Sequence, residues 1–209
     1  MKKNLLTIAM LASCTSLFAQ TTKFEGWAAG LGVSAGSLVN KITDTDGYDV
    51  DTGKVNTAGF LDFSYASVVG SSTLLAVGAT YDLNKSKAAS LTTSDYGASL
   101  ISKNHYSLYV QPMYLISNDT AVFGKLAYHS FSGVIPRNEW YYDAEKSGKF
   151  NGIGYGFGVK TFLNKDLYLQ VEAGWVDYKK KSFYYDIGSI GYDYKVKSTN
   201  GAVSIGYQF

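Results

Sequence analysis

The C-terminal segment of the chain alternates strictly between large apolar side chains and small or polar ones. Its apolar positions are Val203, Ile205, Tyr207 and Phe209. Successive side chains of a β-strand point to opposite faces, so such a strand has one oily face. An apolar face that ends in an exposed aromatic residue is unfavourable in water, but it is favourable in a strand that faces the acyl chains of a bilayer. The pattern predicts a membrane-spanning β-strand.

The first 19 residues have the features of a secretory signal peptide. Two lysines follow the initial methionine, residues 5–11 are apolar but too short to span a bilayer, and Ala19 offers a cleavage point. We therefore expect a signal peptide at residues 1–19 and a single domain at residues 20–209. The alternative is a lipoprotein in which Cys14 is acylated rather than removed, because the residues before it resemble a lipoprotein processing box.

Composition after residue 19 excludes several classes of protein. Without the two leader lysines, 17 basic residues face 17 acidic ones, so nothing in the charge balance indicates binding to nucleic acid. No cysteine remains for a disulfide or a thiolate site. No stretch approaches the roughly 18 to 20 apolar residues of a transmembrane helix. A chain of this kind would cross a membrane with strands.

Seven further segments show the same alternation, at residues 24–36, 55–66, 73–82, 105–116, 122–128, 151–163 and 167–175. Short connections near residues 67–72, 117–120 and 163–166 alternate with long polar ones near residues 37–54, 84–103, 129–149 and 177–196. This asymmetry is typical of outer-membrane barrels. The prediction is an all-β fold, an eight-stranded antiparallel up-and-down transmembrane β-barrel with short periplasmic turns and four long extracellular loops.

A soluble ligand-binding barrel of similar size is the alternative fold. In such a barrel the large apolar side chains point inward and the charged ones point outward. Here the face opposite the apolar one consists mostly of glycine, alanine and serine, which cannot line a ligand cup. Aromatic residues such as Trp27 and Trp175 fall near strand ends, where a membrane barrel carries its aromatic girdles. The membrane interpretation is therefore favoured.

Four stretches resemble the small outer-membrane β-barrel family that includes the opacity-type and outer membrane protein A-type transmembrane domains. They are Ser107–Tyr114, Phe123–Tyr128, Gly154–Lys160 and Gly206–Phe209. The resemblance covers essentially all of residues 20–209. It implies a Gram-negative outer membrane with its lipopolysaccharide as surroundings, and insertion by the barrel assembly machinery. Tyr207 and Phe209 are similar to the C-terminal signal that this machinery recognises.

Four charged residues fall on the inner faces of the predicted strands: Asp62, Lys125, Lys160 and Glu172. The lumen of an eight-stranded barrel is only wide enough for its own side chains, and buried charges persist there by pairing. We expect an ionic cluster that acts as a structural plug. The alternative is the gate of a narrow pore.

Catalytic, cofactor and metal sites are not predicted. His129 and Ser130 are adjacent, whereas lipid A deacylase barrels separate their histidine and serine by one residue, and His105 has no evident acidic partner in its own strand. The aspartates of residues 44–51 do not have the spacing of an EF-hand.

The predicted function is therefore non-enzymatic: a barrel that displays surface loops for a structural or surface-interaction role, such as adhesion to an unknown extracellular ligand. Transport through the lumen is the first alternative, and lipid A modification is a disfavoured second. Lys179, Lys180 and Lys181 open the last predicted loop, where they would contact the phosphates of lipopolysaccharide or remain solvated.

Overall fold

The computed structural model describes residues 23–44, 49–84, 86–93, 96–135, 146–184 and 191–209. The strands are β1 (Gly26–Asp44), β2 (Asp49–Val68), β3 (Thr73–Asp82), β4 (Ser86–Thr93), β5 (Tyr96–Leu115), β6 (Thr120–Ile135), β7 (Lys146–Phe162), β8 (Leu167–Tyr178), β9 (Lys181–Tyr184) and β10 (Gly191–Gln208). No helix among these residues is long and apolar enough to cross a membrane.

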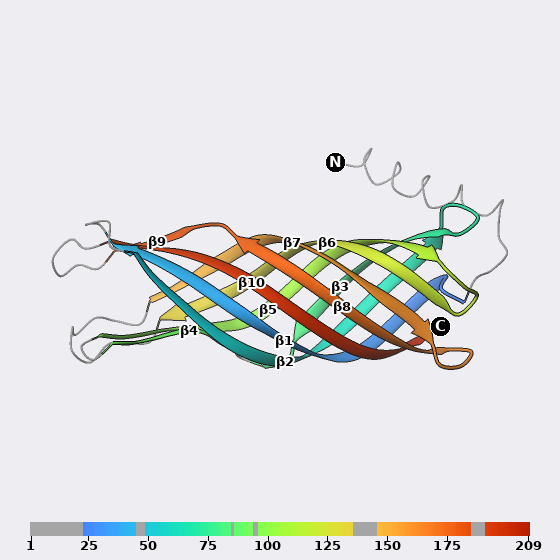
Figure 1. The fold of residues 1–209 in the computed structure, drawn as a ribbon, viewed down its shortest axis with the longest axis horizontal. Helices are drawn as coiled ribbons and strands as arrows, with labels where there is room; N and C mark the ends of the chain where they lie inside the picture. Colours follow the sequence, from blue (N-terminus) through green and yellow to red (C-terminus); the bar gives the residue numbers. More distant parts are fainter. Residues whose placement is uncertain (1–22, 45–48, 85, 94–95, 136–145, 185–190) are drawn as a thin grey trace, which may run out of the picture.

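Eight of the strands close into one antiparallel barrel, in the order β1, β2, β3, β5, β6, β7, β8 and β10, with β10 paired back to β1 (Figure 1). The two remaining strands are short continuations: β4 follows β3 in the chain and pairs with β5, and β9 follows β8 and pairs with β10. The predicted eight-stranded fold is confirmed. Figure 1 shows the three short turns and the C-terminus at one end of the cylinder, which we call the turn end.

An apolar band covers the outside of the barrel on the turn-end side. Its large residues are exposed, among them Leu31, Val77, Leu126, Phe157, Val171 and Ile205. Aromatic rings border the band on both sides. Trp27 packs on Tyr65 at the turn end with ring centroids 4.9 Å apart, and Tyr155 packs on Trp175 at the other border at 5.7 Å. This is the arrangement expected of lipid-facing strands.

Large side chains fill the lumen at the turn end. This turn-end layer consists of Phe24, Ala28, Ala66, Leu74, Ala76, Met113, Ala121, Phe123, Phe162 and Tyr168. Phe24 meets Phe162 edge to face with ring centroids 4.8 Å apart, and Tyr168 is 1 % exposed. Side chains thus fill the narrow interior of the eight-stranded barrel at this level.

The strands continue far beyond the second aromatic border, into a region that we call the head. It comprises residues 37–44, 49–58, 86–93, 96–104, 130–135, 146–151, 177–184 and 191–198. The ladder between β2 and β3 starts at Phe60 and Asp82, and the ladder between β7 and β8 stops at Gly152 and Tyr178. Beyond these pairs, no ladder in the described part of the chain joins β2 to β4 or β7 to β9. The head therefore consists of two four-stranded sheets, β9-β10-β1-β2 and β4-β5-β6-β7, which form the two prongs at the left of Figure 1.

Apolar side chains from both sheets meet inside the head. This head layer consists of Leu100, Phe131, Phe150, Val176, Tyr178, Phe183, Tyr194 and Val196, with Leu38 packed against it. Charged side chains such as Lys195 and Lys197 point outward from the same strands. The apolar face thus changes sides along strands such as β6, β7 and β10: it faces outward in the band and inward in the head.

The prediction of four long loops is wrong for most of the described residues of those segments. Residues 37–44, 96–103, 129–135 and 191–196 belong to strands. Their outward residues are often polar or charged, such as Lys41, Ser132 and Lys195, which is typical of loops, yet inward residues such as Leu38 and Val196 continue the alternation. The residues 45–48, 94–95, 136–145 and 185–190 lie outside the described part, and so do Ala19 and Cys14.

Glycines on the inner face of β7 make room for side chains of its neighbours. A Cβ atom added to Gly158 would lie 2.2 Å from the carbonyl oxygen of Val171 and 2.4 Å from the ring of Phe123. A Cβ atom on the outward-facing Gly201 would meet nothing closer than 3.8 Å. We expect Gly158→Ala to lower the free energy of unfolding by about 2 kcal/mol through overpacking.

Urea-dependent unfolding from phospholipid vesicles measures this effect, with Gly201→Ala as the matched control. The control should change stability by less than about 0.5 kcal/mol. Equal stability losses in the two variants would contradict a tight inner face.

Candidate functional site

A cavity of about 130 Å³, lined by both apolar and polar side chains, lies in the lumen between the turn-end layer and the head layer. Its walls include Asp82, His105, Lys125, His129, Glu172 and Tyr178. Glycines of β7 and β8 contribute bare backbone to the wall, which leaves the space open. A cavity of this volume has room for about four water molecules.

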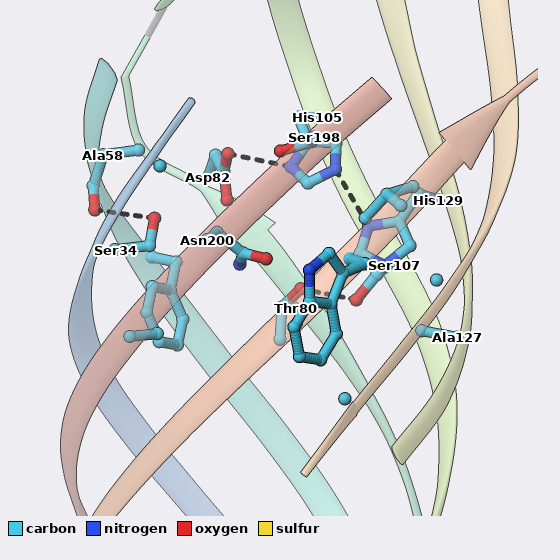
Figure 2. A pocket seen from close by; sticks show the side chains of 18 of the residues that line it. Ser34, Ala58, Thr80, Asp82, His105, Ser107, Ala127, His129, Ser198 and Asn200 are labelled. Atoms are coloured by element: carbon cyan, nitrogen blue, oxygen red, sulfur yellow. Dashed lines mark hydrogen bonds and ion pairs between the residues drawn. The ribbon is translucent and has the colours of Figure 1, made fainter. Parts of the chain in front are cut away.

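Three strands bring a carboxylate and two imidazoles into one hydrogen-bonded chain in this cavity, as Figure 2 shows. Asp82 of β3 lies with Oδ2 2.8 Å from Nδ1 of His105 on β5. Nε2 of His105 lies 3.1 Å from Nδ1 of His129 on β6, and the hydroxyl of Tyr178 on β8 lies 3.4 Å from the same Nε2. The two imidazole rings are nearly parallel, with an interplanar angle of 10°.

A β-bulge in β5 lies next to this chain. Between its pairs with Ser132 and Ser130, β5 contains one residue more than β6, and Asn104 within the bulge has a positive φ of 53°. An extra residue exchanges the two faces of a strand. Ser102 therefore points inward on one side of the bulge, whereas His105 points inward on the other.

An ionic layer lies deeper in the lumen, between the cavity and the turn-end layer. Lys125 contacts both carboxylate oxygens of Glu172, at 3.1 and 2.9 Å. Tyr109 donates a hydrogen bond to Asp62 at 2.8 Å. Lys160 donates to the side-chain oxygen of Gln208 at 3.1 Å.

The four charges predicted for the lumen, Asp62, Lys125, Lys160 and Glu172, therefore lie in one region, with Asp62 close enough to be influenced electrostatically by the other three. Only Lys125 and Glu172 form an ion pair with each other. Neutral side chains, Tyr109 and Gln208, complete the coordination of the remaining two. The role of this layer as a structural plug remains a prediction.

The C-terminal residues lie at the seam where the barrel closes. The amide of Phe209 donates to the carbonyl oxygen of Trp27 at 2.8 Å, and its ring packs against Tyr207 with centroids 5.2 Å apart. Both rings are exposed on the apolar band. The assembly signal at Tyr207 and Phe209 remains a prediction, and the exposure of both rings is compatible with it.

The three lysines predicted to contact lipopolysaccharide lie around the start of β9. Lys179 and Lys180 are exposed, whereas Lys181 is half-buried. Lys180 forms an ion pair with Asp193 at 2.5 Å, and Ser182 donates to the same carboxylate at 2.6 Å. Lys180 and Ser182 hold the pKa of Asp193 below its ordinary value.

Because the pKa of the Asp193 carboxyl is lowered in the folded state, this group stabilises the local structure in a way that depends on pH. The contacts of Asp193 stabilise the pairing of β9 with β10 at pH values above the unfolded-state pKa, and this contribution is lost as pH falls through the lowered folded-state pKa. We expect amide exchange in β9 to speed up on acidification in this window. Asp193→Asn should exchange faster at neutral pH and lose the pH response, and an unchanged response in that variant would contradict the assignment.

Two features of the cavity could not be predicted from the sequence. His105 has an acidic partner, Asp82, but it comes from a different strand, and the register of β3 with β5 is needed to find it. Ser130 is buried, points to the other face of β6 from His129, and donates to Asn151 at 3.0 Å. The adjacency of His129 and Ser130 is thus no catalytic pair. Among the described residues, no group of three or more His, Cys, Asp and Glu side chains is arranged to hold a metal ion.

Comparisons with known proteins agree with this architecture. Residues 5–209 match the family described as "Outer membrane protein beta-barrel domain". The outer membrane protein OprG of Pseudomonas aeruginosa is similar in structure, with a TM-score of 0.61 and 14% sequence identity over 90% of this chain and 99% of that protein.

Two further solved structures are more distantly similar. They are Ail, the attachment invasion locus protein of Yersinia pestis (TM-score 0.46, 14% identity, 88% of this chain and 99% of that one), and the outer membrane protease OmpT of Escherichia coli (TM-score 0.49, 10% identity, 93% and 100%). No curated protein matches the chain.

Proposed function

Since this chain belongs to the outer membrane protein β-barrel domain family, we propose that it is a non-enzymatic frame that presents its head to a partner outside the cell. The family gives an integral location in the outer membrane. The head is the observation that carries the proposal. Its strands extend well beyond the roughly ten residues that a tilted strand needs to cross a bilayer, since β1 and β2 contain 19 and 20 residues.

A packed interior supports display by a rigid surface. Leu100, Phe131 and Phe150 of one sheet face Phe183, Tyr194 and Val196 of the other. Flexible, solvated loops would not have a packed apolar core of this kind. The core therefore fixes the outward residues of both sheets in position, which favours recognition of a partner over a purely structural role.

The filled lumen supports display over transport. The turn-end layer and the ionic layer occupy the lumen below the cavity, and a dry packed layer resists the passage of ions. Catalysis also lacks support: Ser107, the serine that faces His129 across the ladder, shares its hydrogen bond with Thr80 at 2.7 Å.

Outward lysines on the head favour an anionic partner. Lys103 and Lys149 flank Ser132 on adjacent strands, and Lys195 and Lys197 lie on β10. Located just outside the aromatic border, such side chains are in reach of phosphates on lipopolysaccharide, as proposed for Lys179, Lys180 and Lys181. Exposed lysines attract phosphate without a fixed geometry.

Cells that display the wild-type protein should attach to at least one member of a panel of extracellular matrix proteins and anionic polysaccharides. A variant with Lys103, Lys149, Lys195 and Lys197 changed to glutamate should lose most of this attachment at equal surface amount, and it should co-purify with less lipopolysaccharide. Planar-bilayer recordings of the wild type should stay silent. Stepwise conductance, or no attachment to any member of the panel, would contradict the proposal.

A further inference from the structure

We propose that the chain of Asp82, His105 and His129 is an acid-responsive lock that holds the base of the head together. The lock stays closed with both imidazoles neutral or with one of them protonated, and it opens when both are charged. The response to pH requires no bound partner and does not depend on what the head binds.

The hydrogen-bond partners determine where the protons lie when both rings are neutral. The carboxylate of Asp82 can only accept, so Nδ1 of His105 carries a hydrogen. Nε2 of a neutral His105 then has a lone pair and must accept, so Nδ1 of His129 donates to it. Tyr178 approaches the same Nε2 and can donate as well. Both histidines are therefore Nδ1–H tautomers.

One added proton leaves the chain intact. It occupies Nε2 of His129, and the hydrogen between the rings then either stays on Nδ1 of His129 or moves to Nε2 of His105, which makes His105 the imidazolium and His129 a neutral Nε2–H tautomer. Either way a single hydrogen lies between the two rings. The added positive charge is also offset by Asp82, whose side chain contacts His105 directly.

A second proton breaks the chain. Both facing nitrogen atoms, 3.1 Å apart, would then carry a hydrogen, and neither could accept. Two like charges on stacked rings also repel each other. Nε2–H of His105 could still donate to the hydroxyl oxygen of Tyr178, so the contact that is lost is the one between His105 of β5 and His129 of β6.

The other charges that face the pair do not compensate for a second proton. Lys125 of β6 and Glu172 of β8 line the same cavity but neutralise each other as an ion pair. Asp62 of β2 and Lys160 of β7 lie deeper in the ionic layer. The residues that β1, β2, β7 and β10 contribute to the cavity wall are uncharged, among them Ser34, Asn56, Gly154 and Asn200. Asp82 of β3 thus balances one imidazolium, and the residues that line this cavity include no second unpaired carboxylate that could balance another.

The lock supports the head layer directly. Tyr178 meets both His129 and Phe131 edge to face, with ring centroids 6.5 and 5.0 Å apart. Phe131 stacks on Phe150 at 4.9 Å. Backbone pairing is weak at this level, because the β5 bulge interrupts one ladder and the β7–β8 ladder stops nearby. Opening of the lock should therefore loosen the head and leave the apolar band unchanged.

Nitrogen-15 NMR of labelled histidines in detergent micelles tests the closed state. At neutral pH, both rings should give the Nδ1–H pattern, which is the minor tautomer of histidine in water. Nε2–H patterns for both rings would overturn the proposed chain.

Amide hydrogen exchange, corrected for the intrinsic effect of pH, tests the opening. Between about pH 8 and about pH 4, the head segments of β5, β6 and β7 should gain roughly tenfold in exchange, with no change in the apolar band. His129→Gln retains a neutral donor and should remove the response, and His105→Gln provides a second variant if the first does not fold. An equal response in wild type and variants, or no response in the wild type, would overturn the lock. Both readouts use the purified protein without a partner, so they are separate from any test of display.

Discussion

Glu172→Ala is expected to lower the free energy of unfolding by about 3 to 4 kcal/mol, because it removes the carboxylate that forms an ion pair with the ammonium group of Lys125. The side chain of Lys125 is only 11% exposed, so bulk water cannot replace the lost partner. Water in the adjoining cavity reduces the penalty and places the effect near the lower end of the range for broken buried pairs. Equilibrium unfolding in urea from phospholipid vesicles measures the change.

Two controls separate a broken buried pair from the loss of a charge as such. Asp177→Ala removes a carboxylate that lies 4.0 Å from Lys197 on the surface of the head, and it should cost less than about 1 kcal/mol. Glu172→Gln retains an acceptor for Lys125 and should cost less than Glu172→Ala. A loss in Glu172→Ala no greater than that of the surface variant would mean that the ionic layer is well hydrated.

Val171→Arg is expected to cost about 3 kcal/mol, because Val171 is exposed in the middle of the apolar band. Arginine at this depth must leave water for the acyl chains or bend toward the membrane surface. The same unfolding assay in vesicles measures the loss.

Val39→Arg is the matched control for the membrane boundary. Val39 is similarly exposed on the outside of β1, but it lies opposite Lys197 in the head. Arginine there should change stability by less than about 0.5 kcal/mol. A similar loss in both variants would contradict the border between the apolar band and the head.

The barrel follows from the sequence because one physical signal repeats in every strand that spans the band. Positions such as Phe157 and Ile205 must face lipid, and small residues must face a crowded lumen, so a period of two is visible without any tertiary knowledge. The short turns are equally visible: Asn164 accepts hydrogen bonds from the amides of Asp166 and Leu167, which is why its sequence reads as a turn.

The head does not follow from the same signal, because its polarity is reversed. Val196 is buried and Lys197 is exposed, whereas an outward apolar face is the signature that identifies the membrane strands. Alternation does persist in Tyr194–Lys197, so a search for both phases of the pattern would extend the strands. The pairing of Asp82 with His105 is harder to predict, since it depends on the register between β3 and β5 and on a one-residue bulge.

The hydrogen bonds of Gln208 depend on the register between the first and last strands of the barrel. Its amide nitrogen donates to the carbonyl oxygens of Glu25 and Trp27 at the start of the first strand, and its amide oxygen accepts from the buried Lys160. If β1 and β10 paired with a register shifted by two residues, the amide of Gln208 would be displaced. The buried ammonium group of Lys160 would then lose this acceptor. The side chain of Gln208 therefore couples the pairing of β1 with β10 to the hydrogen bonding of a buried ammonium group on β7, two strands away, so that correct closure of the barrel also completes its interior.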